Sequence, residues 1–333
     1  MIISRTPFRV SFFGGGTDYP AWLREHPGAV LGTTIDKYCY ITARYLPPFF
    51  EHRSRIIYSR MEHVRQSIDE IEHPSVRETL RFLKIQEGVE IHHDGDLPAR
   101  AGLGSSSSFT VGLLNVLYAL RGSMATKEQL AREAIHIEQS MIRENVGCQD
   151  QVLAAFGGLN YIEFSHDGTP AVRQVTAPKT VTDGLQEHLM LFFTGFSRMA
   201  SEVAVHQIRN IPNRTSELTT MYGLVQEALK AVSAADYPLF GRLLHESWEL
   251  KRSLSEKITT PEIDTIYERA RKAGAAGGKI LGAGGGGFIL IYAEPGVKPW
   301  VRQALSGLLE IPFKFENLGS QIIFYQPNSG VVA

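Results

Sequence analysis

The chain has 333 residues, which is longer than most single domains and predicts either two domains or one large α/β domain. Hydrophobic residues make up 43% and charged residues 21%, a composition that allows a hydrophobic core and excludes disorder as the main state. The 34 basic and 35 acidic side chains leave a formal net charge of −1, so no overall field attracts nucleic acid or an anionic membrane.

The cysteine content and the apolar runs indicate a compartment. Cys39 and Cys148 provide neither a disulfide framework nor a zinc site, which favours a reducing environment. The first residues lack the long apolar segment of a signal peptide, and the longest apolar runs, 189–193 and 288–293, are too short to span a membrane. We therefore expect a cytoplasmic protein with no nucleic-acid or membrane partner.

The N-terminal part of the chain is predicted to run from a strand into a glycine loop. Residues 2–13 alternate in polarity and end at 14–16, where every residue is glycine. A short helix is expected next, with Thr17 or Asp18 as its cap and Pro20 in its first turn. The other expectations for this part are strands at 29–46 and 88–94 and a hairpin or loop insertion at 47–75.

A second glycine loop, at 102–104, leads straight into the four serines 105–108 and an apolar helix. Glycines let backbone N–H groups converge, and the helix N-terminus adds positive potential, so a phosphate is favoured here. A flexible linker or an ordinary helix cap is the alternative, although the apolar helix argues against a linker. The loop is not a Walker A loop, because no Gly-x-x-x-x-Gly-Lys-Ser/Thr occurs. The predicted phosphate ligands are Gly102, Leu103, Gly104, Ser105, Ser106 and Ser107.

The rest of the chain is predicted to be mostly helical between short strands. A helix is expected after Thr126, because Gln129 follows at the spacing of a capping box, and a shorter one at 148–156. Further helices are expected at 199–209, 214–233, 237–252, 261–272 and near 296–308. Further strands are expected at 158–164, 187–194, 279–281, 288–292, 311–315 and 320–326.

A third glycine run, at 282–287, formally fits the Gly-x-Gly-x-x-Gly fingerprint of dinucleotide-binding proteins. That fingerprint requires a helix after it, whereas the pattern at 288–292 predicts a strand. A nicotinamide-dependent dehydrogenase is therefore disfavoured. We expect a glycine turn between two strands that approaches the other glycine loop.

Three carboxylates are candidates for chemistry, and each also has an ordinary structural interpretation. Glu138 lies beside the apolar stripe of the helix after Thr126, where surface salt bridges are common. Asp150 stands in a polar break before a short helix, which it could cap. Asp18 could cap a helix or accept hydrogen bonds from sugar hydroxyls. The eleven histidines show no metal-ligand spacing.

The three glycine motifs, in this order, resemble those of the GHMP small-molecule kinases. The matching segments are 6–19, 98–108 and 282–287, which are spread over nearly the whole chain. Within the family, the segments 14–18, 33–38 and 149–151 are most similar to kinases that act on D-glycero-D-manno-heptose 7-phosphate.

The resemblance implies an α+β fold of two domains, with the active site in the cleft between them. The N-terminal domain, expected at 1–178, would carry the ATP phosphate loop and the catalytic aspartate. The C-terminal domain, expected at 179–333, would be a ferredoxin-like α+β unit. The boundary falls within 170–185, where the sequence pattern also indicates a break.

The resemblance also implies roles for individual residues. Asp150 matches the catalytic aspartate, and Arg9 matches the basic residue that partners it. Ser106 and Glu138 match the contacts to Mg²⁺, which would bridge the phosphates of ATP. The implied sugar-binding residues are Gly15, Gly16, Thr17, Asp18, Gly284 and Gly285.

The implied reaction transfers phosphate from ATP to the anomeric O1 of heptose 7-phosphate and gives the 1,7-bisphosphate. Galactokinase-like members carry Glu-His before Thr-Asp-Tyr, whereas this chain has Gly15-Gly16, which argues against galactose. A bound sugar phosphate also requires cations, because a buried dianion without partners is prohibitive. Lys37 and Arg198 are the first candidates and Arg44 the next, although each could equally be a solvated surface charge.

Two alternatives stay open at this point. The chain could be a 1-kinase for an unphosphorylated sugar such as fucose, mannose or galactose. It could also be a non-catalytic sugar-binding regulator on the same fold. The retention of Arg9, Glu138 and Asp150 together argues against a regulator. Whether the chain forms a homodimer is likewise open.

Overall fold

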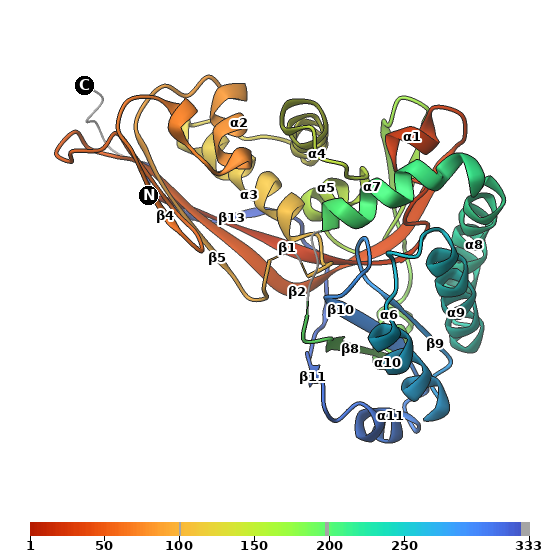
Figure 1. The fold of residues 1–333 in the computed structure, drawn as a ribbon. Helices are drawn as coiled ribbons and strands as arrows, with labels where there is room; N and C mark the ends of the chain where they lie inside the picture. The colour runs from red at the N-terminus through yellow and green to blue at the C-terminus, as the bar shows by residue number, and fades with distance from the viewer. Residues whose placement is uncertain (100, 197–199, 328–333) are drawn as a thin grey trace.

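Two β-sheets organise the chain (Figure 1). The structure, a computed structural model, describes residues 1–99, 101–196 and 200–327. Within these residues, the strands of the first sheet are β1 (Ile2–Phe13), β2 (Gly28–Tyr45), β3 (Ser54–Ile57), β4 (Met61–Val64), β5 (Val89–Gly95), β6 (Asn160–Phe164), β7 (Pro170–Gln174), β12 (Phe315–Glu316) and β13 (Gln321–Tyr325). The strands of the second sheet are β8 (Leu189–Phe193), β9 (Gly277–Ile280), β10 (Phe288–Tyr292) and β11 (Leu309–Glu310).

The long strand β2 is the centre of the first sheet, whose main path runs β13-β1-β2-β5-β3-β4. Its first residues pair with β6 and its last residues with β5, while β1 pairs with it along most of its length. Both faces of β1 are buried over its second half, so burial alternates along the strand only over its first residues. The predicted α+β class is confirmed.

Helices cover both sheets. They are α1 (Pro20–Leu23), α2 (Pro74–Phe82), α3 (Ser105–Leu120), α4 (Lys127–His136), α5 (Gln149–Phe156), α6 (Lys179–Glu187), α7 (Ala200–Asn210), α8 (Thr215–Ser233), α9 (Tyr237–Ser253), α10 (Pro261–Lys272) and α11 (Lys298–Ala304). Figure 1 shows α2, α3, α4 and α5 on one side of the first sheet and the second sheet on the other. None of the described helices combines the length and the hydropathy that crossing a bilayer requires.

The second sheet has the strand order β11-β8-β10-β9, and all its neighbouring strands are antiparallel. Along the chain, β8 is followed by a helical segment, then β9 and β10, then α11 and β11. This β-α-β-β-α-β order is the split βαβ arrangement of ferredoxin-like units. The glycine run 282–287 is the turn between β9 and β10, as the sequence predicts.

The last two strands return to the first sheet. Phe315 of β12 pairs with Ile35 of β2, and Tyr325 of β13 pairs with Ile2 of β1. The expected division at 178/179 stays a prediction as a domain boundary. The segment after β11 nevertheless completes the sheet that residues near the N-terminus begin.

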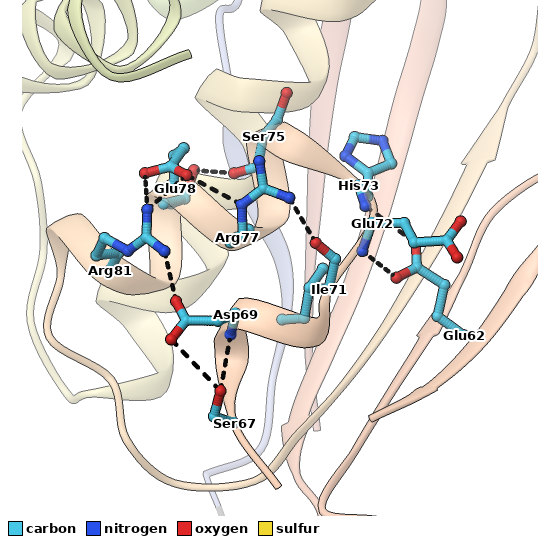
Figure 2. A network of polar contacts seen from close by, with 11 residues as sticks. Glu62, Ser67, Asp69, Ile71, Glu72, His73, Ser75, Arg77, Glu78 and Arg81 are labelled. Carbon is cyan, nitrogen blue, oxygen red and sulfur yellow. Dashed lines mark hydrogen bonds and ion pairs between the residues drawn. The ribbon is translucent and has the colours of Figure 1, made fainter. Parts of the chain in front are cut away.

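The stretch before the phosphate loop contains a hairpin, β3–β4, and also a helix, α2, that the sequence pattern did not predict. Figure 2 shows the contacts that hold this helix in place. The Glu62 carboxylate accepts hydrogen bonds from the N–H groups of Glu72 and His73, just before α2 begins. Arg81 on α2 donates to Glu78 and to Asp69. The contacts made by Glu62 and Asp69 join residues ten to twelve positions apart, so helical spacing rules do not reveal them.

The first helix differs from its prediction in one detail. Tyr19 occupies the N-cap position of α1, and no side chain caps the helix, so the prediction that Thr17 or Asp18 is the cap is wrong. The Thr17 hydroxyl instead donates to the carbonyl oxygens of Gly14 and Ala29 inside the loop. The Asp18 carboxylate faces the other way, toward α5.

Phe240 on α9 packs between the two sheets. Its ring makes edge contacts with Phe12 and Phe13 of β1, with centroid distances of 5.5 and 5.2 Å. It also lies 6.2 Å from the ring of Tyr292 on β10. Phe240 is 1% exposed, so this aromatic cluster fixes the position of α9 and the second sheet against β1.

Replacing Phe240 by alanine should therefore destabilise the protein by about 3–5 kcal/mol, because it leaves a cavity between the sheets. Urea unfolding of the variant and the wild type measures the loss. Phe49→Ala is the control, since Phe49 is 86% exposed, and it should change stability by less than about 0.5 kcal/mol. Equal stability of the Phe240 variant and the control would contradict this role.

Candidate active site

A cleft of about 350 Å³ opens where β1, the start of α3, the start of α5 and the glycine turn of the second sheet meet. This volume lies within the usual range of small-molecule sites. Its described lining includes all three glycine motifs that the sequence analysis singled out. The lining residues are Arg9, Ser11, Gly15, Gly16, Asp18, Tyr19, Gly102, Gly104, Ser105, Ser106, Ser107, Glu144, Asn145, Val146, Gly147, Gln149, Asp150, Ala204, Gln207, Lys251, Lys279, Gly282 and Ala283.

Arg9 and Asp150 form a bidentate ion pair in this cleft. Both hydrogen bonds, from Nε to Oδ1 and from Nη2 to Oδ2, measure 2.7 Å. The remaining terminal nitrogen of Arg9 donates to the carbonyl of Gly102 at 2.6 Å. The Arg9 side chain is 4% exposed and that of Asp150 is 25% exposed, so the carboxylate is the member that a ligand can reach. Asp150 does not cap α5, because Cys148 occupies that position.

The predicted phosphate loop lies directly against this pair. Gly104 is the N-cap of α3 with φ of 72°, and no side chain caps the helix. A Cβ at this position would stand 3.1 Å from Cγ of Arg9 and 3.4 Å from Oδ2 of Asp150. The positive end of the α3 dipole therefore faces the cleft beside the ion pair, which favours an anion there.

The two glycine loops touch each other, as expected from the sequence. A Cβ on Gly102 would lie 2.4 Å from the carbonyl oxygen of Leu281, and one on Gly282 would lie 2.6 Å from Cα of Gly102. Both glycines have positive φ. Only residues without a side chain allow this contact between the loop before α3 and the turn of the second sheet.

Asp18 is buried at the floor of the cleft, with 1% exposure. Its carboxylate oxygens accept hydrogen bonds from the N–H groups of Gly16, at 3.0 Å, and Gln149, at 3.2 Å. Burial raises the pKa of Asp18 above its ordinary value, and the charge of Asp150 adds to this, while the bond from Gly16 opposes it. The carboxylates of Asp18 and Asp150 thus lie in the same cleft.

Glu138 lies behind the phosphate loop rather than on the surface. The helix that begins with α4 continues as a π-helical turn, Ile137–Ile142, and such turns often mark functional sites. Glu138 is fully buried, and its Oε2 accepts hydrogen bonds from Ser107, at 2.9 Å, and Gln151, at 2.5 Å. Its Oε1 has no hydrogen-bond partner. Burial raises the pKa of Glu138 to about 7.

These residues fit a divalent cation that is bound together with phosphates. The buried Glu138 carboxylate has no basic partner among the described residues, and one of its oxygens is unpaired. Among the described residues, no group of three or more acidic, histidine or cysteine side chains is placed to hold a metal ion by itself. Mg²⁺ suits such a site, because it is commonly held by one or two carboxylates together with phosphates. Ser107, not Ser106, is bonded to Glu138, and Ser106 lies exposed at the rim.

Several predicted site residues lie elsewhere. Lys37 on β2 donates to Asp36 and does not line the cleft. Arg44 pairs with Glu90 at the far end of the sheet. Gly284 and Gly285 pack against the carbonyl of Ile258, just behind the lining residues Gly282 and Ala283. Leu103 and Thr17 are buried supports of their loops, and Arg198 falls outside the described residues.

The structure adds polar residues to the cleft that the sequence did not indicate. Ser11, Gln149 and Gln207 carry uncharged polar groups, and Lys251 and Lys279 carry ammonium groups. Gln149 directly precedes Asp150, the predicted catalytic residue, and this position was the one indication in the sequence that Gln149 lies near the site. Lys251 and Lys279 lie on α9 and β9, more than a hundred residues from the first glycine loops, and no spacing rule connects them.

Comparison with known proteins identifies related chains. The family description "GHMP kinases N terminal domain" matches residues 71–158, and "GHMP kinases C terminal" matches residues 227–307. A D-glycero-alpha-D-manno-heptose 7-phosphate kinase of Campylobacter jejuni is 28% identical over 315 residues, covering 91% of this chain and 93% of the relative. A galactokinase of Pyrococcus furiosus is 28% identical over 370 residues, covering 99% of both chains.

A solved structure has the same fold over nearly the whole chain. It is described as a D-glycero-D-manno-heptose 1-phosphate kinase from Bacteroides thetaiotaomicron. Its TM-score is 0.77 at 25% identity, and the match covers 96% of this chain and 98% of that structure.

The burial of Glu138 predicts a pH-dependent difference between the wild type and Glu138→Gln without metal or nucleotide. The folded-state pKa of about 7 exceeds the unfolded value of 4.5, so the folded wild type binds more protons between these values. Its stability therefore falls as pH rises through this window, and the glutamine variant does not share that fall. Near pH 5 the two should be similar, and at pH 8 the variant should be more stable by about 3 kcal/mol.

Urea unfolding at the two pH values measures this difference. Glu256→Gln is the control, since its carboxyl is exposed, and it should show no such pH dependence. If the stability of the wild type and of Glu138→Gln depended on pH in the same way, burial would not disfavour the charged form of the Glu138 carboxylate.

Proposed function

Since the chain belongs to the GHMP kinase family, we propose that it is an ATP-dependent kinase that phosphorylates O1 of D-glycero-D-manno-heptose 7-phosphate. Its relatives over nearly its whole length include sugar kinases, which supports a sugar as the acceptor. The product of the proposed reaction is the heptose 1,7-bisphosphate.

The observation that carries the proposal is the Arg9–Asp150 pair beside the uncapped start of α3. Phosphoryl transfer depends on positioning and charge neutralisation more than on covalent chemistry. The α3 N-terminus, with Gly102, Gly104 and the following serines, supplies an anion site for the ATP phosphates. Asp150 supplies a partly exposed carboxylate next to it. The proposed site for the ATP phosphates and the carboxylate proposed to serve the acceptor therefore lie next to each other.

In the proposed mechanism, Asp150 accepts a hydrogen bond from the acceptor hydroxyl and takes its proton as the new bond to phosphorus forms. Arg9 holds the Asp150 carboxylate in one orientation through two hydrogen bonds. Its positive charge also helps to neutralise charge that develops during transfer. Asp18 is available to accept hydrogen bonds from further sugar hydroxyls, because it lines the same cleft.

Glu138, together with the serines at the start of α3, would hold Mg²⁺ against the ATP phosphates. The predicted serine ligand is Ser106, and the contact of Ser107 with Glu138 makes Ser107 a second candidate. Bound Mg²⁺ would neutralise charge on the β- and γ-phosphates. The unpaired oxygen of Glu138 supports this assignment.

Two observations support a heptose phosphate as acceptor. The Campylobacter relative and the Bacteroides structure are both described as kinases of a phosphorylated D-glycero-D-manno-heptose, although the descriptions differ in the position of the phosphate. Gly15 and Gly16 stand where galactokinase-like members carry Glu-His. A Cβ at Gly16 would lie 2.8 Å from Nε2 of Gln207, so a larger side chain does not fit there without displacing it.

Asp150→Asn should lower kcat by about 10²–10⁴-fold, because the amide cannot take the proton. The KM for ATP should change by less than about twofold, since Asp150 serves the acceptor. Steady-state kinetics measure both, with a melting curve to show that the variant is folded. Asp183→Asn, at an exposed ion pair with Lys179, is the control. Retention of more than about a tenth of kcat would exclude Asp150 as the general base.

A panel of sugars tests the acceptor. We expect heptose 7-phosphate to give a higher kcat/KM than mannose, fucose or galactose, and phosphorus NMR to show the new phosphate on C1. A plain hexose that is used more efficiently would replace heptose 7-phosphate as the substrate. ATP consumption with none of these sugars, despite correct folding, would favour a sugar-binding regulator.

A further inference from the structure

Two lysines line the cleft without a counter-ion. Lys251, on α9, is 4% exposed, and Lys279, on β9, is 2% exposed. The Lys251 ammonium donates to the carbonyl of Gly282 at 2.5 Å and, at 3.4 Å, to that of Ile280. The Lys279 ammonium donates to the carbonyl of Phe12 at 2.8 Å. Among the described residues, no carboxylate lies within ion-pair distance of either.

Such burial is costly unless a ligand compensates it. An ammonium group has three donors, and the protein uses two on Lys251 and one on Lys279. Burial lowers the pKa of Lys251 to about 8 and that of Lys279 well below its usual value, and the charge of Arg9 adds to both. An anion in the cleft would supply the missing acceptors and the missing negative charge.

Lys279 bonds to strand β1, and Lys251 bonds to Gly282 in the turn that touches the phosphate loop at Gly102. The carbonyl that binds Lys279 belongs to Phe12, the neighbour of the lining residue Ser11. Asp18, which we assign to the sugar hydroxyls, is among the charges that both lysines sense. The α3 N-terminus already provides a separate anion site for the nucleotide. The cleft thus has two positions for anions, one at α3 and one at the lysines.

Two further polar atoms point to a hydroxyl-bearing ligand in the same place. Oγ of Ser11 and Oε1 of Gln149 are buried and have no hydrogen-bond partner. They flank Gly15, since a Cβ there would lie 3.6 Å from Oγ of Ser11 and 3.5 Å from Nε2 of Gln149. Buried polar groups without partners are uncommon in folded proteins, and a bound sugar would satisfy them.

We propose that Lys251 and Lys279 bind the phosphate group that the acceptor sugar already carries, with Ser11 and Gln149 binding its hydroxyls. This assignment rests on the proposed function and names the residues that give it specificity. It replaces Lys37 and Arg44, which lie outside the cleft. An unphosphorylated sugar would leave both ammonium groups uncompensated.

Lys251→Met and Lys279→Met test the proposal through the difference between two acceptors. Each variant should raise the KM for heptose 7-phosphate by about tenfold or more, because a charge-assisted contact is lost. The KM for ATP and the kcat/KM for the dephosphorylated heptose should change by less than about threefold. Lys298→Met is the matched control. Its ammonium also binds only carbonyls, those of Glu187 and Leu189, and lies outside the cleft lining.

The outcomes separate the alternatives. A raised KM for ATP would assign the lysines to the nucleotide and overturn the proposal. An equal loss for both heptoses would make the lysines structural ties between the sheets, which also overturns it. Ser11→Ala breaks no bond within the protein, so it should fold normally and raise the KM for both heptoses several-fold. No change in that variant would remove the hydroxyl part of the proposal.

A binding measurement keeps this test independent of the proposed reaction. With a non-hydrolysable ATP analogue bound at α3, calorimetric titration of inorganic phosphate should show binding to the wild type and to Lys298→Met. Binding should be lost in Lys251→Met and Lys279→Met. Loss of binding would support the lysine site even if heptose 7-phosphate proved not to be the acceptor. Binding that is unaffected by either lysine variant would overturn it.

Discussion

Arg9 donates three hydrogen bonds from an almost completely buried position, two to Asp150 and one to the carbonyl of Gly102. These bonds connect strand β1, helix α5 and the glycine loop before α3. Because a buried guanidinium without a partner costs several kcal/mol, the pair holds α5 and the loop in register with β1. The absence of a side chain at Gly104 lets the loop pack on the pair. The geometry of the cleft follows from this one contact.

Several ionisable groups in and behind the cleft are buried without a partner of opposite charge among the described residues, so bound ligands would favour their charged forms. Burial disfavours the charged forms of Asp18 and Glu138, and it also disfavours the charged forms of Lys251 and Lys279. Ligands that bring phosphate to the lysines and a cation to Glu138 would relieve these costs. Each would then stabilise the folded protein in addition to forming its own contacts. Fixed charges of this kind also need no rearrangement when phosphate is transferred.

The parts of the site that the sequence predicted are those with a local signal. Glycine runs before a helix or between strands indicate that the backbone approaches a ligand or another loop closely. The three runs, 14–16, 102–104 and 282–287, all lie at or beside the cleft. The order of these runs, compared with a known family, also indicated Arg9 and Asp150. The α+β fold class followed from the same resemblance, while periodicity predicted individual strands and helices.

The parts that the sequence did not predict depend on contacts between distant segments. Which serine faces Glu138 is decided by the pitch of the helix and the π-helical turn, so Ser107 rather than Ser106 makes the contact. Lys251 occupies an ordinary position in an amphipathic helix, and only the packing of α9 against β9 brings it to the cleft. In the sequence, Lys37 appeared as suitable as Lys251 for binding a phosphate. It lies on β2, however, where strand pairing fixes the direction of each side chain, and it does not line the cleft. Helix α2 was missed because its start is fixed by the carboxylate of Glu62, in a preceding strand.

The return of β13 to the first sheet has a consequence for how the chain is made. More than three hundred residues separate β13 from β1 along the chain, yet the two strands are hydrogen-bonded neighbours. During synthesis, the edge of β1 therefore stays open until more than three hundred residues have followed it. An open strand edge can pair with other chains, so the nascent protein is exposed to aggregation while these residues are synthesised. The pairing of β13 therefore makes the completion of the sheet that carries Arg9 depend on a segment that is synthesised much later than β1.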